Sequence, residues 1–257
     1  MRGGVSLSPT FQSLLGRVSV ALLVAAFCLA ADARPAWPRD RILIIGNSFT
    51  GGVKTNLRFL TRSALRDTYV SVRASDGWTL NDHALSRATL RRIRSSEWNV
   101  VVLQDQSDGI FTKRYPGARL LHGEIGAVGG NTVFFMTWGD REDGLDVYDA
   151  LRGVPGGDEG YVPIALELDA AVAPVGWAFR EVLLEEPDAE LWSVDGHHAS
   201  ERGRYLASLV LYAAIYGESP VGLWATPKLT AEQVLHDQLL AERVVFRNPS
   251  EWNIDVP

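Results

Sequence analysis

The sequence predicts one α/β domain, a three-layer αβα sandwich around a central, mainly parallel sheet of about five strands. Two observations lead to this fold class. Short runs of β-branched and apolar residues recur along the chain, and the stretches between them are long enough to hold helices. Strands of a parallel sheet are apolar throughout because helices cover both faces. The alternation predicts βαβ crossovers and a doubly wound sheet.

The first 33 residues have the pattern of a secretory signal peptide. Arg2 and Arg17 precede an apolar run over 18–30, and Ala31-Asp32-Ala33 supplies a small-residue cleavage site. The apolar run is too short for the ~20 residues of a membrane-spanning helix, so a retained anchor is the less favoured alternative. We therefore expect cleavage after Ala33, export to the periplasm or the medium, and a single mature domain over 34–257 without stable membrane insertion.

Composition narrows the chemistry and the partners. The only cysteine is Cys28, within the predicted signal peptide, so the mature chain has no disulfide, no thiolate nucleophile and no cysteine-ligated metal. The formal net charge is −6, which argues against a nucleic-acid partner. Hydroxyl and imidazole groups must carry any catalysis.

Five apolar runs are the predicted strands. They are short and rich in β-branched residues, and the first is ended by a glycine. Their ranges are 41–46, 69–72, 100–103, 132–136 and 171–175.

Helices are predicted between and after these strands. Apolar spacing of the helical kind occurs over 57–65, 80–93, 164–168 and 177–184, and a strongly apolar helix over 205–216 is stopped by Gly217 and Pro220. Thr230 and Gln233 have the spacing of a capping box that begins a final helix. The polar stretch 139–160 is long for a connection, and we expect a loop that borders a substrate site.

Ser48 is the first candidate for chemistry. It follows the first strand in Gly46-Asn47-Ser48, and open α/β sheets bind ligands at the carboxyl ends of their strands. Free backbone amides at the start of the next helix would favour the negative charge that develops during attack on an ester. A helix-capping serine is the alternative interpretation.

Asp195 and His198 are the candidates for activating a serine. A serine hydroxyl needs a base, usually a histidine that a carboxylate orients, and the two residues lie three apart in a turn-like segment. His197 is the second choice of base. A solvated loop that caps the next helix through Ser200 is the alternative interpretation of this segment.

The two motifs together resemble the first and last blocks of the SGNH/GDSL hydrolases, and the resemblance extends over the mature chain. It implies an SGNH/flavodoxin-like fold with Ser48 as nucleophile and His198 and Asp195 as its partners. It also implies an oxyanion hole made by the amides of Ser48 and Gly77 and by a side chain after the third strand. There Val100 to Asp108 resembles the Gln-Gly-Glu-Ser block of acetylxylan and sialate O-acetylesterase-like relatives, which assigns the donor role to Gln104, with Gln106 and Asp108 as alternatives.

Competing classes fit less well. Val53 separates Gly52 from Lys54, so the glycines after the first strand do not form a phosphate loop. Asp195, the two adjacent histidines and His122 lack the spacing of a metal site, and we predict neither a metal nor another cofactor. The Gly-x-Ser-x-Gly elbow of α/β-hydrolases is absent.

These observations predict an exported serine esterase that forms an acyl-enzyme. Export and the glutamine-type block favour an O-acetyl group on a carbohydrate as the substrate, and a lipid or short-acyl ester is the alternative. A non-catalytic glycan-binding or scaffolding protein on the same fold is the alternative of another class. Four aromatic residues in predicted loops could flank the site and suit sugar rings, or be buried packing. They are Trp78, Phe111, Tyr115 and Trp138.

Overall fold

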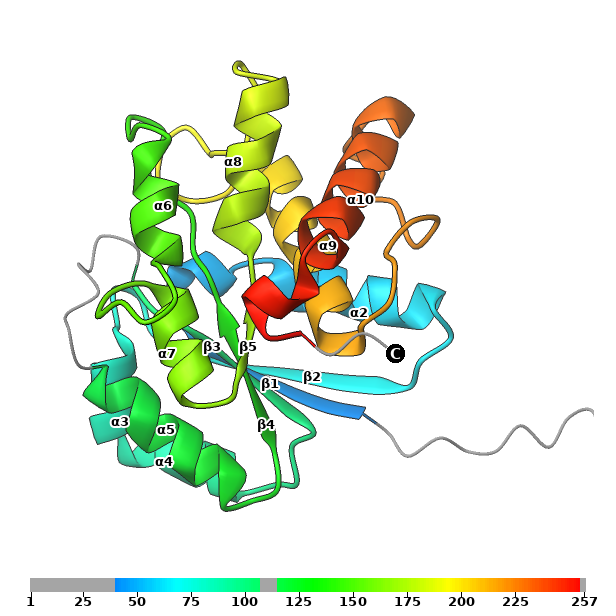
Figure 1. Cartoon of the computed structure of the whole chain (residues 1–257). Coiled ribbons are helices and arrows are strands. Elements are labelled where there is room, and N and C mark those ends of the chain that lie inside the picture. Colours follow the sequence, from blue (N-terminus) through cyan, green and yellow to red (C-terminus); the bar gives the residue numbers. More distant parts are fainter. Residues whose placement is uncertain (1–39, 107–114, 255–257) are drawn as a thin grey trace, which may run out of the picture. The chain divides into compact units, whose positions relative to one another are not determined.

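A single parallel sheet in the order β2-β1-β3-β4-β5 forms the centre of the computed structural model (Figure 1). The structure describes residues 40–106 and 115–254, so the predicted signal peptide lies outside it. The strands are β1 (Asp40–Gly46), β2 (Thr68–Ala74), β3 (Val100–Gln104), β4 (Asn131–Phe135) and β5 (Ala171–Ala173). All five predicted strands are present, so the predicted fold class is confirmed.

Helices cover both faces of this sheet. One layer holds α2 (Val53–Ser63), α8 (Val175–Glu185), α9 (Glu201–Tyr216) and α10 (Ala231–Phe246). The opposite layer holds α3 (Leu80–Leu85), α4 (Arg87–Arg94) and α5 (Pro116–Gly126). Shorter elements are η1 (Ser48–Thr50), α6 (Asp146–Arg152), α7 (Tyr161–Glu167) and η2 (Pro249–Trp252).

The helix boundaries differ from the predictions at identifiable residues. The helix predicted over 80–93 is two helices, because Ser86 leaves the helical backbone conformation and caps α4 by accepting a hydrogen bond from the Thr89 amide. The fifth strand ends before Pro174, and α8 begins at Val175. Neither α5 nor α6 was predicted, and α6 lies within the predicted loop 139–160. The capping box of Thr230 and Gln233 begins α10 as predicted.

The core is centred on β1 and β3, which lie inside the sheet. Residues 42–45 of β1 are at most 1% exposed, and they pair with β2 on one side and β3 on the other. Trp98 and Phe179 are among the large, fully buried side chains of the same core cluster. The continuous apolar strands of the sequence are thus the strands with helices on both faces.

The order of the strands fixes where a ligand can bind. The chain moves from β1 outward to β2, then returns past β1 to β3, so the crossovers leave β1 and β3 in opposite directions. A crevice forms at such a point, at the carboxyl ends of the two strands. Ser48 follows β1 and Gln104 ends β3, so both lie at this point.

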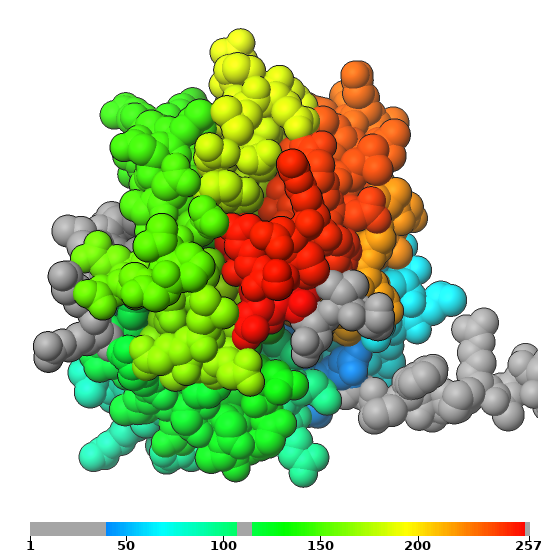
Figure 2. All heavy atoms as spheres, viewed as in Figure 1, coloured from blue at the N-terminus to red at the C-terminus, as the bar shows by residue number. Residues whose placement is uncertain are grey.

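The C-terminal segment, residues 249–254, packs against edge strand β5. On the face seen in Figure 2, it lies between the green α6 and α7 region and the orange part of α10. Trp252 of η2 is 2% exposed and donates to the Val244 carbonyl. Within the described part of the chain, no helix has both the length and the apolar character to cross a bilayer.

Candidate active site

Ser48 lies two residues after the end of the interior strand β1, at the first position of η1. The buried Asn47 side chain accepts a hydrogen bond from the Phe49 amide at 3.0 Å and so begins this turn. The turn leaves Ser48 partly exposed while Asn47 and Phe49 are buried. No acceptor among the described residues takes a hydrogen bond from the Ser48 amide. Ser48 therefore combines an accessible hydroxyl with a free backbone donor.

His198 and Asp195 lie against Ser48 although 150 residues separate the serine from the histidine. The Ser48 Oγ is 2.8 Å from His198 Nε2, and His198 Nδ1 is 2.7 Å from Asp195 Oδ2. The other Asp195 oxygen accepts from the amides of His197 and His198, both at 3.0 Å. This is the geometry in which an imidazole can take the proton of an attacking hydroxyl while a carboxylate fixes its tautomer.

The same contacts keep Asp195 ionised. Its hydrogen bond with His198, followed by the two backbone amides, holds the pKa of the Asp195 carboxyl well below its usual range. A carboxylate that stays charged stabilises the imidazolium that forms when the base accepts a proton.

His197, the second candidate for the base, has a different partner. Its Nδ1 lies 2.5 Å from Oδ1 of Asp140, which follows β4. No hydrogen bond joins His197 to Ser48. The structure thus brings His198 to the serine and directs His197 to Asp140.

Three further contacts brace the loop that carries His198. The Trp138 indole donates to the His197 carbonyl at 3.0 Å, and the Arg141 amide donates to the Gly196 carbonyl at 2.8 Å. The Arg141 guanidinium reaches the Trp192 carbonyl at 3.1 Å. Residues 138–141, where the predicted loop 139–160 begins, therefore position the loop of the candidate base. No spacing in the sequence marks Asp140 for this role, because its partner is 57 residues away.

The aromatic residues predicted to flank the site have different positions. Trp138 is fully buried and stacks between Phe49 and Phe179, with ring centroids at 4.5 and 4.8 Å. Tyr115 is buried, and its hydroxyl bonds the Gly160 backbone. Only Trp78 is partly exposed. Phe111 lies outside the described residues.

Gly77, a predicted oxyanion donor, lies in the turn after β2. Its φ of +70° suits glycine, and its side of the turn is open, because a Cβ placed there would meet no atom within 4 Å. The side-chain amide of Asn47 holds this turn near Ser48, since Asn47 Nδ2 donates to the Trp78 carbonyl at 3.2 Å. Among the described residues, the Gly77 amide donates to no acceptor.

Gln104 has a position that does not support its predicted role. The side chain is fully buried, its Oε1 accepts from the Asn47 amide at 2.7 Å, and its Nε2 donates to the Asp105 carbonyl. Gly46 permits this contact, because a Cβ there would lie 2.2 Å from Gln104 Oε1. Gln104 thus joins the ends of β1 and β3 instead of facing the crevice.

Gln106, the alternative to Gln104, is partly exposed and contacts Asn47. Asn47 Oδ1 is occupied by the Phe49 amide, so its Nδ2 group donates, both to the Trp78 carbonyl and to Gln106 Oε1. Gln106 therefore turns its oxygen to Asn47 and leaves its Nε2 group without an acceptor among the described residues. Asp108, the other alternative, lies outside them.

The remaining histidines have structural positions. His83 of α3 is fully buried between Thr89 and the Gly46 carbonyl, and burial lowers the pKa of its imidazole. His122 of α5 bonds Thr132. Among the residues that the structure describes, no three His, Cys, Asp or Glu side chains are grouped as metal ligands.

Comparison with known proteins identifies similar structures. A candidate SGNH hydrolase from Slackia heliotrinireducens is 28% identical, with a TM-score of 0.53 over 68% of this chain and 98% of that chain. A DUF4886 family protein from Bacteroides uniformis is 14% identical, with a TM-score of 0.68 over 86% and 98%. An acetylxylan esterase from Geobacillus stearothermophilus is 14% identical, with a TM-score of 0.50 over 70% and 95%. No family model matches the sequence, and no curated protein matches it.

Proposed function

Because this chain belongs to the SGNH/GDSL hydrolase superfamily, we propose that it is an exported serine esterase whose preferred substrate is an O-acetyl group on a carbohydrate. The observation that carries the proposal is the hydrogen-bonded series Ser48–His198–Asp195, with 2.8 and 2.7 Å between successive partners. Export rests on the signal-peptide pattern of residues 1–33. The carbohydrate ester rests on that pattern, on the glutamine-rich end of β3 and on the structural similarity to an acetylxylan esterase.

The reaction has two steps. His198 Nε2 takes the Ser48 proton as Oγ attacks the ester carbonyl, and the protonated imidazole then gives that proton to the leaving alcohol. Water attacks the resulting acyl-enzyme, with His198 again as base, and releases acetate and Ser48. Asp195 orients His198 and stabilises its charged form in both steps.

Backbone and side-chain amides stabilise the oxyanion of each step. The amides of Ser48 and Gly77 are the backbone donors, and the Gln106 Nε2 group is the side-chain donor. Gln106 takes this role in place of Gln104, whose amide is buried against the ends of β1 and β3. Loss of one such donor typically costs ~3 kcal/mol of transition-state stabilisation. Gln106→Ala should therefore lower kcat by about a hundredfold with little change in KM.

A fluorophosphonate probe and four variants test the assignment. Wild-type protein and Ser63→Ala, which changes an exposed serine of α2, should be labelled, whereas Ser48→Ala should not. His198→Ala should lose activity on p-nitrophenyl acetate. If His197→Ala lost activity and His198→Ala kept it, the choice of base would be wrong.

Substrate class is tested separately. Acetylated xylan and p-nitrophenyl esters of short and long acyl chains are compared by kcat/KM. We expect acetyl esters of glycans to be preferred. Preference for long chains would identify a lipid esterase, and the absence of both labelling and turnover would favour a glycan-binding protein.

A further inference from the structure

The net charge of the chain is −6, but two parts of the chain have opposite net charges. Residues 40–94 hold 10 Lys and Arg against 4 Asp and Glu, whereas residues 95–257 hold 11 against 26. The first part contains β1, α2, β2, α3 and α4, so the positive charge lies at the β2 edge of the sheet. Such a local excess can attract an anionic partner even though the whole chain is acidic.

The basic side chains of the two parts also differ in how many of them have a carboxylate partner. In the described residues after Ser95, every Arg and Lys except Arg247 lies near a carboxylate, as in Arg202 with Asp237 and Lys228 with Glu201. In residues 40–94, eight basic side chains have no carboxylate partner among the described residues. Two of them, Arg41 and Arg92, lie against the ring of Trp98. We call the other six the basic face: Lys54, Arg58, Arg62, Arg73, Arg87 and Arg91.

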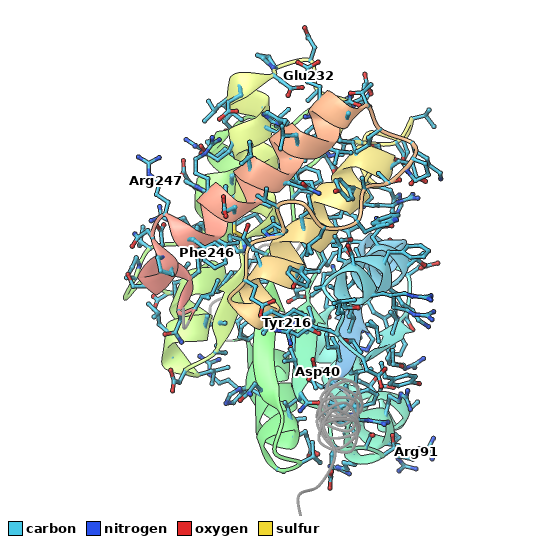
Figure 3. All side chains as sticks on the ribbon, turned by 90° about the vertical axis from the view of Figure 1, so that its right-hand side faces the viewer. Asp40, Arg91, Tyr216, Glu232, Phe246 and Arg247 are labelled. Atoms are coloured by element: carbon cyan, nitrogen blue, oxygen red, sulfur yellow. The ribbon has the colours of Figure 1, made fainter. Side chains whose placement is uncertain are left out.

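The basic face consists of two rows of side chains on either side of edge strand β2. Lys54, Arg58 and Arg62 are four residues apart along α2, so they follow one exposed side of that helix. Arg87 and Arg91 have the same spacing on α4 and are also exposed. In Figure 3 the blue and cyan elements lie at the lower right, with Arg91 labelled at their lower end.

Edge strand β2 connects the basic face to the candidate active site. Arg73, near the carboxyl end of β2, donates to Thr89 of α4 and lies 5.7 Å from the ring centroid of Trp78. Trp78 belongs to the turn that Asn47 holds beside Ser48. Lys54 lies at the start of α2, six residues after Ser48. A long ligand on the basic face would therefore extend to the site.

We propose that the basic face binds the anionic chain of an acidic polysaccharide, and that the ester attacked by Ser48 is carried by such a glycan. This inference rests on the proposed function, since it names the substrate class of the same site. Five of the six cations are arginines, whose planar fork binds carboxylates through paired hydrogen bonds. The rows lie on helices in the opposite layers of the fold, with edge strand β2 between them, so the cations follow an edge of the sheet. An extended polymer can follow this edge, whereas a flat bilayer would reach only part of it.

Binding is measured with Ser48→Ala protein, so that no ester is consumed, by affinity electrophoresis in gels that contain polygalacturonate or dextran. We expect retardation by polygalacturonate alone, and its loss near about 1 M salt, where exposed charges are screened. A variant with Arg58→Glu, Arg62→Glu and Arg91→Glu should bind at least about tenfold more weakly. The double variant Lys54→Glu with Arg87→Glu should also bind polygalacturonate more weakly. Arg247→Glu changes an unpaired, exposed arginine of the acidic part and should retain binding within about twofold.

Three results would overturn the proposal: no retardation by polygalacturonate, equal weakening by Arg247→Glu, or binding to phosphatidylglycerol vesicles without binding to the polysaccharide. The same charge reversals in protein that keeps Ser48 should leave hydrolysis of p-nitrophenyl acetate unchanged. That small ester tests the proposed function without the basic face. Hydrolysis without polysaccharide binding would therefore refute only the inference about the glycan.

Discussion

Two carboxylate–imidazole pairs lie side by side at the candidate site, and they have different positions relative to the serine. Asp195 orients His198, which contacts Ser48. Asp140 binds His197, which has no hydrogen bond to the serine. Since the two histidines are adjacent in the chain, the position of one ring constrains the other. We therefore interpret Asp140 as a positioning residue for the candidate base.

Replacing Asp140 should reduce turnover without removing the triad. In Asp140→Ala, the loop of His198 loses one of its fixed contacts, and a shift of the base away from Ser48 lowers kcat by about 10- to 100-fold. KM for p-nitrophenyl acetate should change little, and Asp140→Asn should recover part of the rate because its amide oxygen still accepts from His197. Asp149→Asn, an exposed carboxylate of α6, is the control. Wild-type kcat in folded Asp140→Ala would contradict the positioning role.

At the scale of elements, a partly buried charged cluster joins α8, α9 and α10. The guanidinium of Arg202 is almost buried and lies 2.9 Å from Asp237, which is fully buried, and 2.7 Å from Glu186. His236 lies 3.1 Å from both Asp237 and Glu185. Burial lowers the pKa of the His236 imidazole, but its hydrogen bonds with Asp237 and Glu185 outweigh that effect, and the pKa is raised. The cluster thus favours a protonated His236 between these helices.

The raised pKa of His236 makes the stability of the helix layer depend on pH. A histidine whose pKa is higher in the folded state stabilises the fold below its unfolded pKa, and this contribution is lost as the pH rises through the folded value. The free energy of unfolding in urea should therefore exceed that of His236→Gln by more at pH 5.5 than at pH 9. His122→Gln, whose histidine bonds a threonine, controls for the general effect of pH. An equal difference at both pH values would contradict the prediction.

At the scale of the whole molecule, the C-terminal segment closes the sheet on the side away from the candidate site. The η2 segment contacts α7, α10 and β5. Asn253 donates to the Ala170 carbonyl at the amino end of β5 at 3.2 Å, whereas Ser48 lies at the carboxyl ends of the strands. Stability and chemistry therefore depend on opposite ends of the sheet.

Trp252→Ala should separate these two properties. Removing a fully buried tryptophan leaves a cavity and should lower the free energy of unfolding by about 3–5 kcal/mol. The kcat per folded molecule should stay unchanged because the Trp252 side chain contacts Val244 and Trp177, and neither residue belongs to the candidate triad. Leu239→Ala, at a position of α10 that is 45% exposed, should change stability by less than about 0.5 kcal/mol. Loss of kcat in folded Trp252→Ala would show that the two ends are coupled.

Much of the fold was predictable because it depends on local patterns. Continuous apolar runs identify strands that are buried on both faces, and Thr230 with Gln233 identifies the start of α10 by spacing alone. The split of the helix predicted over 80–93 was missed, since the apolar spacing continues across Ser86 and its backbone conformation shows the cap. Helix α6 was also missed, because its polar sequence resembles that of a loop.

Some residues of the candidate site were likewise predictable from the sequence, whereas the positions of others depend on the tertiary structure. Ser48 was predicted because it follows a strand, and Asp195 and His198 were predicted because they share a short motif. The distances among the three side chains agree with a common site. The positions of Gln104 and Gln106 were decided by Asn47, whose hydrogen bonds reach 57 and 59 residues along the chain. Asp140 became part of the site only through a partner equally distant in sequence. Local spacing carries no information about such contacts, because the packing of strands and loops brings these residues together.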